Sequence, residues 1–350
     1  MRTKFVFCIL ICLSFFQSLD AQDAQFSQFG LNYSTYNPSM IGIFEGDLRI
    51  HVGYRDRWHS FAPENEFNVI SVALDYKLSE EISNFSIGFN TIQDWSGSTQ
   101  LKQTKSYLTA GYLLQLTNGK YGVSSSFLGT GFQVGFGYST VDPNGFWFGR
   151  QFNLETFQVD ENISSGEDFG TEPLNAFYVG INLGLIWYTI HKKGGMHAGL
   201  AVSHINTPNI SLIPKEIVKI ARRYTVHAGL DRKFTQENSI QPSVIFNLQG
   251  KAYTGLFGTY FTNSLNYIGE SGFSVGAWLK LSNHIERVML EGLVLAAKFE
   301  HKNFEFGASY DVTLSSAGVF NSRMGGFELN FSYTRGRTLQ NKILKRIPGL

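Results

Sequence analysis

The segment from Phe177 to Trp187 reads FYVGINLGLIW, and its strict alternation constrains the fold more than any other feature of the chain. Large apolar side chains occupy every second position, and the positions between them hold Tyr178, Gly180, Asn182, Gly184 and Ile186. A period of two is that of an extended strand, because successive strand side chains point to opposite faces. The segment therefore predicts a strand with one apolar face and one small or polar face.

The same alternation recurs in about 14 segments, each of roughly ten residues, which suits a tilted crossing of a lipid bilayer. The predicted strands are Asp47–Tyr54, Phe67–Lys77, Phe85–Ile92, Lys105–Leu116, Tyr121–Tyr138, Phe177–Ile190, Met196–His204, Arg223–Phe234, Ile240–Leu248, Ala252–Thr262, Phe273–Leu281, Val288–Phe299, Phe304–Thr313 and Gly326–Tyr333. We therefore predict an all-β fold, a transmembrane antiparallel β-barrel of about 14 strands with periplasmic N- and C-termini.

The lengths of the connections support this topology, because outer-membrane barrels keep short turns inside and long loops outside. Asn118-Gly119 is a strong hairpin signal on the inner side. The long outer connections are Ser139–Ala176, Ile205–Arg222 and Leu314–Met324. Two connections fit less well, since Gln249–Lys251 is short but outer and Asn263–Gly272 is long but inner.

Carboxylates within the strands indicate which face is the lumen. Glu305, Asp311 and Glu328 alternate with aromatic and aliphatic neighbours. A charged side chain facing lipid would cost a few kcal/mol near the midplane, so these three residues are expected to face inward. The alternative is a large soluble antiparallel β protein exported to the periplasm.

The N-terminus has the features of an export signal. Arg2 and Lys4 precede an apolar run from Phe5 to Phe16, and a cut is expected after Ala21. This run is too short to span a bilayer. We divide the chain into a signal peptide (1–21), an N-terminal leader (22–44), an outer-membrane barrel (45–333) and a basic periplasmic tail (334–350).

Charge and cysteine usage exclude several functions. Both cysteines, Cys8 and Cys12, lie in the signal, so the mature chain has no disulfide or thiol chemistry. Removing the three charged signal residues from 29 basic and 28 acidic residues leaves 27 of each. The mature chain is therefore neutral, without the basic surface that nucleic-acid binding requires.

Two segments depart from this even balance. The loop Thr140–Ala176 is acidic, and it is either a solvated loop or a site for cations or a partner. The tail is basic, and it is either a solvated extension or a contact for a periplasmic partner. Its basic residues are Arg335, Arg337, Lys342, Lys345 and Arg346.

No catalytic motif stands out. Asp168-Phe169-Gly170 resembles a kinase triplet, but no phosphate-binding glycine motif precedes it. His197 and His227 share the polar faces of adjacent predicted strands, where two imidazoles could join a metal site or, more ordinarily, a hydrogen-bonded lumen network. We predict a protein that is not an enzyme, with no catalytic residues, cofactor or metal.

Several separated segments, in order, resemble the PorP/SprF family of type IX secretion system membrane proteins from Bacteroidetes-type bacteria. They are QFSQF (25–29), Asn37-Pro38-Ser39, YRDRW (54–58), AGLAVSH (198–204), RRYTVHAG (222–229), FGASYDVT (306–313) and GGFEL (325–329). The acidic loop and the basic tail have no counterpart in the family pattern. Residues marked by the resemblance, as structural or partner-contact positions, are Asn37, Pro38, Tyr54, Arg55, Trp58, Arg222, Arg223, Tyr224, Tyr310 and Asp311.

The resemblance implies a noncatalytic outer-membrane barrel of the type IX secretion and gliding machinery. Its partners would be the lipid bilayer, periplasmic components of that machinery, and a secreted adhesin-like surface protein with a type B C-terminal sorting domain. The barrel would help this cargo reach the cell surface and anchor it there. The alternative is a passive or substrate-selective outer-membrane channel, depending on whether the leader plugs the lumen.

Overall fold

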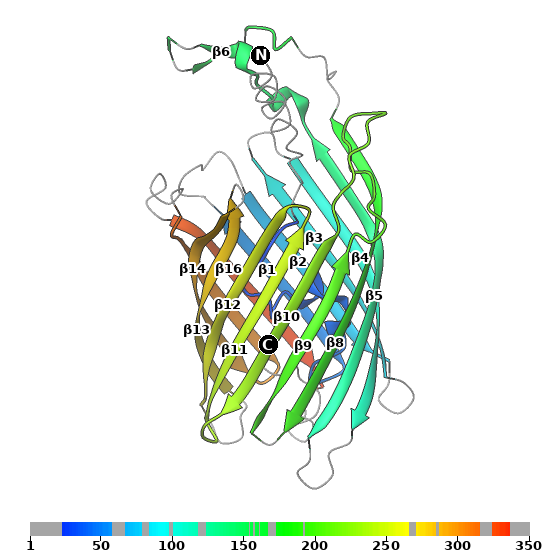
Figure 1. Ribbon diagram of the computed structural model, residues 1–350, viewed down its shortest axis with the longest axis vertical. Helices are drawn as coiled ribbons and strands as arrows, with labels where there is room; N and C mark the ends of the chain where they lie inside the picture. The colour runs from blue at the N-terminus through cyan, green and yellow to red at the C-terminus, as the bar shows by residue number, and fades with distance from the viewer. Residues whose placement is uncertain are drawn as a thin grey trace, which may run out of the picture.

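The computed structural model describes residues 23–57, 67–78, 84–97, 101–117, 124–153, 155–156, 158–160, 162–166, 173–191, 193–265, 271–284, 287–315 and 324–336. Within these residues, fourteen antiparallel strands close into a barrel (Figure 1). Each barrel strand pairs with the barrel strand that follows it in the sequence, and β1 pairs with β16 to complete the ring. The prediction of a closed antiparallel barrel of about 14 strands is confirmed.

The barrel strands are β1 (Leu48–Arg57), β2 (Phe67–Lys77), β3 (Phe85–Ser96), β4 (Leu101–Thr117), β5 (Ser125–Val141), β8 (Leu174–His191), β9 (Gly194–Ser203), β10 (Arg223–Lys233), β11 (Asn238–Gln249), β12 (Ala252–Ser264), β13 (Ser271–His284), β14 (Arg287–His301), β15 (Phe304–Thr313) and β16 (Met324–Arg335). The other elements are α2 (Tyr33–Tyr36), η1 (Pro38–Met40), η2 (Pro143–Gly145), η3 (Gly149–Gln151), and the small hairpin of β6 (Phe152–Asn153) and β7 (Gln158–Val159). No helix among the described residues is long and apolar enough to cross a membrane.

Every predicted strand is present, and the main differences are at strand ends. β2 and β15 have the predicted bounds, whereas most other strands are longer. The short turn after β11 is real, because Gln249 pairs directly with Ala252 and Gly250 adopts a φ of 59° that favours glycine. The connection after β12 is shorter than predicted, since β12 extends to Ser264 and β13 begins at Ser271. Asn118-Gly119 and Asp168–Gly170 lie outside the described residues.

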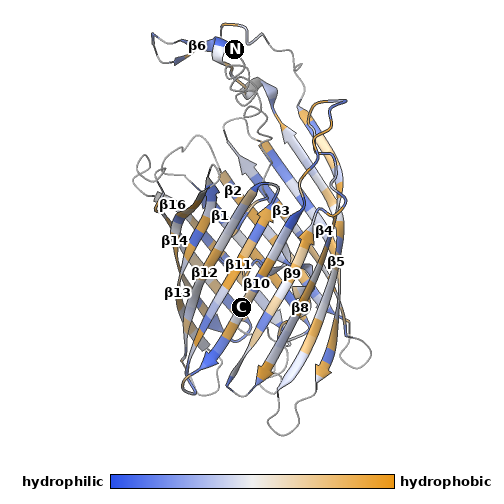
Figure 2. Ribbon diagram, in the orientation of Figure 1, coloured by the Kyte–Doolittle hydropathy of each residue, from blue (hydrophilic) through white to orange (hydrophobic). Residues whose placement is uncertain are grey.

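The two faces of the strands separate as predicted. On β8, Phe177 is 65% exposed on the outer wall, whereas Tyr178 is 5% exposed and faces the interior. Figure 2 shows the apolar and polar residues alternating along the strands. Glu328 is 1% exposed and lies inside with Glu305 and Asp311, on inward-facing positions of β16 and β15. The wall therefore presents apolar side chains outward and polar groups to the lumen.

The long connections lie at one end of the barrel. The β6–β7 hairpin, within the acidic connection between β5 and β8, and the connection 205–222 between β9 and β10 both lie at the upper end in Figure 1. The turn between β10 and β11 lies at the lower end. The side of the membrane that each end faces remains a prediction.

Candidate functional site

The lumen is occupied by the leader, whose described part begins at Asp23. Every residue from Tyr36 to Phe44 is buried, and Phe26 and Asn37 have no exposed surface. The segment enters at the level of β4 and β10 near the long-loop end, and it reaches β1 at the opposite end. Two cavities beside it have room for about 30 Å³ and 20 Å³, the space of one or two water molecules, and a third beside Arg55 and Asp311 has room for about 70 Å³. The leader therefore fills most of the lumen.

Part of the leader is held in shape by its own side chains. The Tyr36 hydroxyl accepts a hydrogen bond from the Phe26 N–H and donates one to the Phe26 carbonyl, both at 2.7 Å. Burial raises the pKa of Tyr36 to about 12, so the hydroxyl stays protonated and keeps its donor. This pair closes a loop of the leader around α2.

Asn37 and Pro38 form the turn that seats the leader on the wall. The Asn37 carboxamide accepts the Ser39 N–H at 3.0 Å and so caps η1, and Pro38 occupies the first helical position, where no N–H is needed. The side-chain nitrogen of Asn37 donates to the Leu185 carbonyl and lies 2.9 Å from Nε2 of His227. The sequence Asn-Pro-Ser is therefore a capped turn bound to β8 and β10.

The wall beneath this turn is made of glycines. A Cβ at Gly131 of β5 would lie 2.3 Å from the Pro38 carbonyl carbon, and one at Gly184 of β8 would lie 2.0 Å from Oδ1 of Asn37. Neither distance is compatible with a side chain at the glycine position. The lumen-facing glycines of β5 and β8 thus leave the space that the leader backbone occupies.

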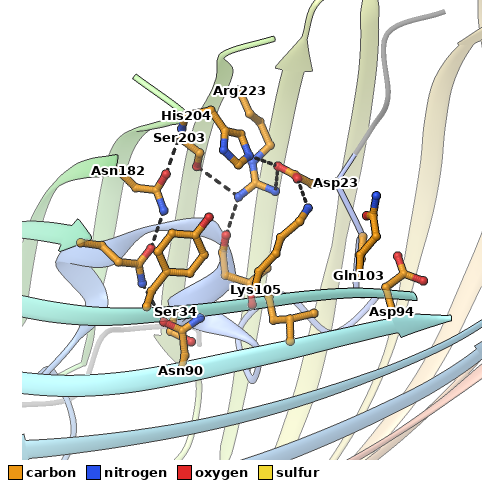
Figure 3. Close-up of a pocket in the computed structure, with 15 residues that line it drawn as sticks. Asp23, Ser34, Asn90, Asp94, Gln103, Lys105, Asn182, Ser203, His204 and Arg223 are labelled. Atoms are coloured by element: carbon orange, nitrogen blue, oxygen red, sulfur yellow. Dashed lines mark hydrogen bonds and ion pairs between the residues drawn. The ribbon is translucent and has the colours of Figure 1, made fainter. Parts of the chain in front are cut away.

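Asp23 of the leader meets three basic residues of the barrel (Figure 3). Its carboxylate lies 2.5 Å from Nζ of Lys105, 2.8 Å from Nε2 of His204 and 3.1 Å from Nη1 of Arg223. Burial alone would raise the pKa of Asp23, but Lys105, His204 and Arg223 hold it well below its ordinary value. Asp23 is therefore ionised and binds the barrel wall through these three side chains.

A second cluster holds the next leader turn. Glu328 accepts the Ser27 N–H at 2.6 Å and the Gln28 N–H at 3.2 Å. Nη2 of Arg55 lies 2.5 Å from Oδ2 of Asp311, whose carboxylate also accepts the Ser27 hydroxyl. Buried carboxylates of this kind are stable only with such donors and counter-ions.

A third cluster lies toward the start of β1. Nη2 of Arg49 pairs with Oδ2 of Asp75 at 2.5 Å, and its guanidinium lies 3.5 Å from the ring centroid of Tyr33. Lys77 donates from Nζ to the Phe44 carbonyl. Charged wall residues thus contact the leader at several levels of the lumen.

The structure divides the residues marked by the family resemblance into two groups. Asn37, Pro38, Arg55, Arg223 and Asp311 meet in the lumen around the leader. Tyr54, Tyr224 and Tyr310 lie on outward positions of β1, β10 and β15, and Arg222 is exposed at the long-loop end. Trp58 lies outside the described residues.

The basic tail residues are only partly described. Arg335 belongs to β16 and forms an exposed ion pair with Asp47 at 2.8 Å. Burial is slight there, and the Arg335 guanidinium lowers the pKa of Asp47 through hydrogen bonds. Arg337, Lys342, Lys345 and Arg346 lie outside the described residues.

His197 and His227 are neighbours across β9 and β10, as their strand positions predict. Their ring centroids are 5.4 Å apart, and Nε2 of His227 is engaged by the Asn37 carboxamide. Among the described residues, no group of three or more histidine, cysteine, aspartate and glutamate side chains is arranged to hold a metal ion. His227 therefore contacts the leader turn, with His197 packed beside it.

Sequence reasoning missed Asp23, Lys105 and His204. Lys105 stands at an inward position of β4, and a lysine on a lumen face signals a buried counter-ion. Nothing in the sequence connects it to Asp23, since the two residues are brought together only by threading the leader through the barrel.

The closed wall with its apolar exterior and charged, filled lumen defines a β-barrel membrane protein. A family model described as type IX secretion system membrane protein PorP/SprF matches residues 18–333. The chain therefore belongs to the PorP/SprF family and is an outer-membrane protein of the type IX secretion system. No curated protein matches the chain.

Three solved structures illustrate the structural comparison. The chain is similar to the CymD monoaromatic hydrocarbon channel, with 10% identity and a TM-score of 0.43 over 89% of this chain and 93% of that one. A FadL homologue from Pseudomonas aeruginosa has 10% sequence identity and a TM-score of 0.41, over 85% of this chain and 92% of that one. The toluene transporter TodX of P. putida has 8% sequence identity and a TM-score of 0.40, over 85% of this chain and 92% of that one. At these scores the matches carry no argument about this chain, whose barrel rests on its own strand pairing.

Proposed function

We propose that this barrel is a noncatalytic partner in the export and surface anchoring of a secreted adhesin-like protein with a type B C-terminal sorting domain. Membership of the PorP/SprF family supports a role in type IX secretion. The observation that carries the finer proposal is the filled lumen, because a leader bound at several levels favours an anchor over a passive pore.

The connections at the long-loop end offer a surface for such a partner. The connection 205–222 exposes Ile217 (75%), Val218 (49%) and Ile213 (42%), and the connection between β5 and β8 exposes Trp147 (55%). Apolar side chains exposed at a loop tip are common features of protein interaction sites. We propose that this end faces the outside and contacts the cargo, with the start of β1 and the end of β16 on the periplasmic side.

The rest of the domain division is also a proposal. A signal peptide over 1–21 would be removed during export, leaving the leader 22–44 free to enter the lumen. The basic tail, with Arg337, Lys342, Lys345 and Arg346, would contact periplasmic secretion or gliding components. Mass spectrometry of the mature protein tests the cleavage site.

Deleting the gene tests the anchoring role. We expect one adhesin-like protein to be lost from the cell surface and restored by complementation. A complementing Ile217→Ser variant should restore it poorly, whereas Leu265→Ser, an exposed leucine after β12, should restore it fully. Unchanged surface display in the deletion strain would overturn the anchoring role.

Conductance in planar bilayers tests the channel alternative. Since the leader fills the lumen, the full chain should show no large steady current. A large open-state current in the full chain would favour the channel instead.

A further inference from the structure

A lysine, an arginine and a histidine converge on the carboxylate of Asp23. Lys105 comes from β4, Arg223 from the start of β10 and His204 from the residue after β9. Their side chains are 13%, 6% and 3% exposed, so the cluster is almost fully removed from water. Charges buried in this way need a counter-ion, and Asp23 of the leader supplies it.

The same place also recognises backbone. Oε1 of Gln249 accepts the Asp23 N–H at 3.0 Å, and Nε2 of Gln249 donates to the Ala221 carbonyl, which fixes the amide. A donor set for a carboxylate and an acceptor for the N–H of the same residue together fit an aspartyl residue within a peptide. A free carboxylic acid would use only the first part.

The wall holds His204 in an unusual conformation. His204 has a φ of 57°, a left-handed value that a non-glycine residue adopts at a cost on the order of 1 kcal/mol. Its N–H donates to Oδ1 of Asn182 at 2.9 Å, and Asn182 donates to Oε1 of Gln133 at 2.6 Å. These contacts are made within the wall, so the imidazole is positioned by the barrel itself.

The site borders a cavity and not solid core. A cavity with room for about 30 Å³ adjoins Asp23, Lys105, His204 and Arg223 (Figure 3). The adjacent leader residues Ala24 and Gln25 are only half-buried. Ala24 and Gln25 are therefore less enclosed than the Asn37–Pro38 turn.

We propose that Lys105, His204, Arg223 and Gln249 form a receptor for an aspartyl residue of an extended peptide, with Asp23 of the leader as its internal occupant. A second peptide that presents an aspartate from the long-loop end competes with Asp23 and releases the start of the leader. This goes beyond the anchoring role and does not depend on the identity of the cargo.

The receptor is coupled to the outer surface. His204 and Arg223 stand at the two ends of the connection 205–222, whose tip carries the exposed Ile217. Exchange of the occupant therefore changes the anchor of that loop at both ends. A partner that binds the loop and a peptide that binds the receptor act on one another.

Small-molecule rescue of the purified full chain tests the receptor. Asp23→Ala removes the carboxylate and leaves space, so acetate should bind and recover most of the thermal stability that the variant loses. Asp23→Asn is the matched control, since it removes the charge but fills the space and leaves no room for acetate. Acetamide, a neutral probe of the same shape, should do nothing for either variant.

If Asp23→Ala does not refold in plain buffer, refolding yield in acetate against acetamide becomes the readout. Equal effects of acetate on Asp23→Ala and Asp23→Asn, or no effect on Asp23→Ala by either readout, would overturn the proposal. Because only the purified chain is used, this failure is separate from a failure of the anchoring role.

A peptide measurement tests the aspartyl specificity. A labelled peptide of residues 23–36 should displace the start of the leader from the Asp23→Ala chain and bind at least about tenfold more tightly than the same peptide with asparagine in place of Asp23, because loss of a buried charge pair costs more than 1.4 kcal/mol. Equal affinities of the two peptides would contradict the aspartyl receptor.

Discussion

Two arcs of the barrel wall contact the leader in different ways. On β5 and β8, Gly131 and Gly184 present bare backbone, and the leader turn at Asn37 and Pro38 packs directly on it. On β12 and β13, Tyr260 and Trp278 reach inward with ring centroids 4.3 Å apart and join Phe26 and Phe29 of the leader in one apolar cluster. The first arc receives the leader turn on bare backbone at its glycines, while Phe127 and Tyr188 of the same strands pack on leader side chains at another level. The second arc meets the leader with its own aromatic side chains.

The comparison shows how one cylinder accommodates a second segment of chain. A protein interior is packed to a uniform density. Where the leader is bulky, the wall must therefore have small side chains, and where the wall is bulky the leader must leave space. Where the wall has glycine, the leader lies close and hydrogen-bonds to strand carbonyls. Where the wall has aromatic residues, contact is made by side chains. Variants in each arc should therefore fail in different ways.

The largest effect is expected on the aromatic arc. Trp278→Ala removes a side chain that is 4% exposed and leaves a cavity, so the free energy of unfolding should fall by about 3–5 kcal/mol. Hydrogen exchange at the Ser39, Met40 and Ile41 amides should remain slow, because that turn lies on the other arc. Denaturant unfolding in micelles measures the first effect. Loss of protection at the turn would contradict the division into two arcs.

The next effect is expected on the glycine arc. Gly131→Ala places a Cβ against the backbone of Pro38 and Ser39 and should cost about 1–3 kcal/mol by overpacking. The cost should appear as faster hydrogen exchange of the leader turn. Gly255→Ala on β12 is the matched control, because its nearest neighbour would be 3.6 Å away. Equal effects of the two variants would show that the leader does not need the glycine wall.

A pH titration should weaken the binding of the start of the leader, at Asp23, and leave the contacts of both arcs unchanged. The folded pKa of Asp23 lies well below 3.8, because Lys105, His204 and Arg223 favour its ionised form. Its contribution to leader binding is therefore complete above the ordinary pKa of about 3.9 and is lost as pH falls through the lower folded pKa. Bilayer conductance should be unchanged from neutral pH down to about pH 4 and should rise only below it. The Asp23→Asn variant should lack this acid transition, and a transition near neutral pH in the wild-type chain would be inconsistent with the ionised Asp23.

The smallest effect is expected outside the lumen. Arg335 and Asp47 form an ion pair with side chains 53% and 46% exposed, which solvent and salt screen. Arg335→Met should leave the free energy of unfolding unchanged within the precision of denaturant titration. A clear loss of stability would mean that closure between β1 and β16 depends on this pair.

Most of the fold could be predicted from the sequence because each strand carries its own signal. The period of two in Phe177–Trp187 needs no knowledge of the rest of the chain, and β2 and β15 have the predicted bounds. Strand ends were less certain, because the long strands β4, β5 and β8 continue past the alternation that marks the bilayer crossing. Burial of Glu328 followed from parity alone.

The site was predictable only in part. The family resemblance marked Asn37, Pro38 and Arg223, but it gave no reason why they belong together, and it marked Tyr224 equally although that residue faces outward. Asp23 and Lys105 are 82 residues apart and meet only inside the closed barrel. Local patterns carry no information about which leader residue reaches which wall position.

The sequence by itself determined the barrel, its apolar exterior and the inward direction of its charges, because a strand's alternation and the cost of a charge in lipid act locally. Only the tertiary structure decided that the leader occupies the lumen and that Asp23 meets Lys105, His204 and Arg223 there. That outcome depends on the volume left between strands that are distant in sequence, and this volume exists only once the ring is closed.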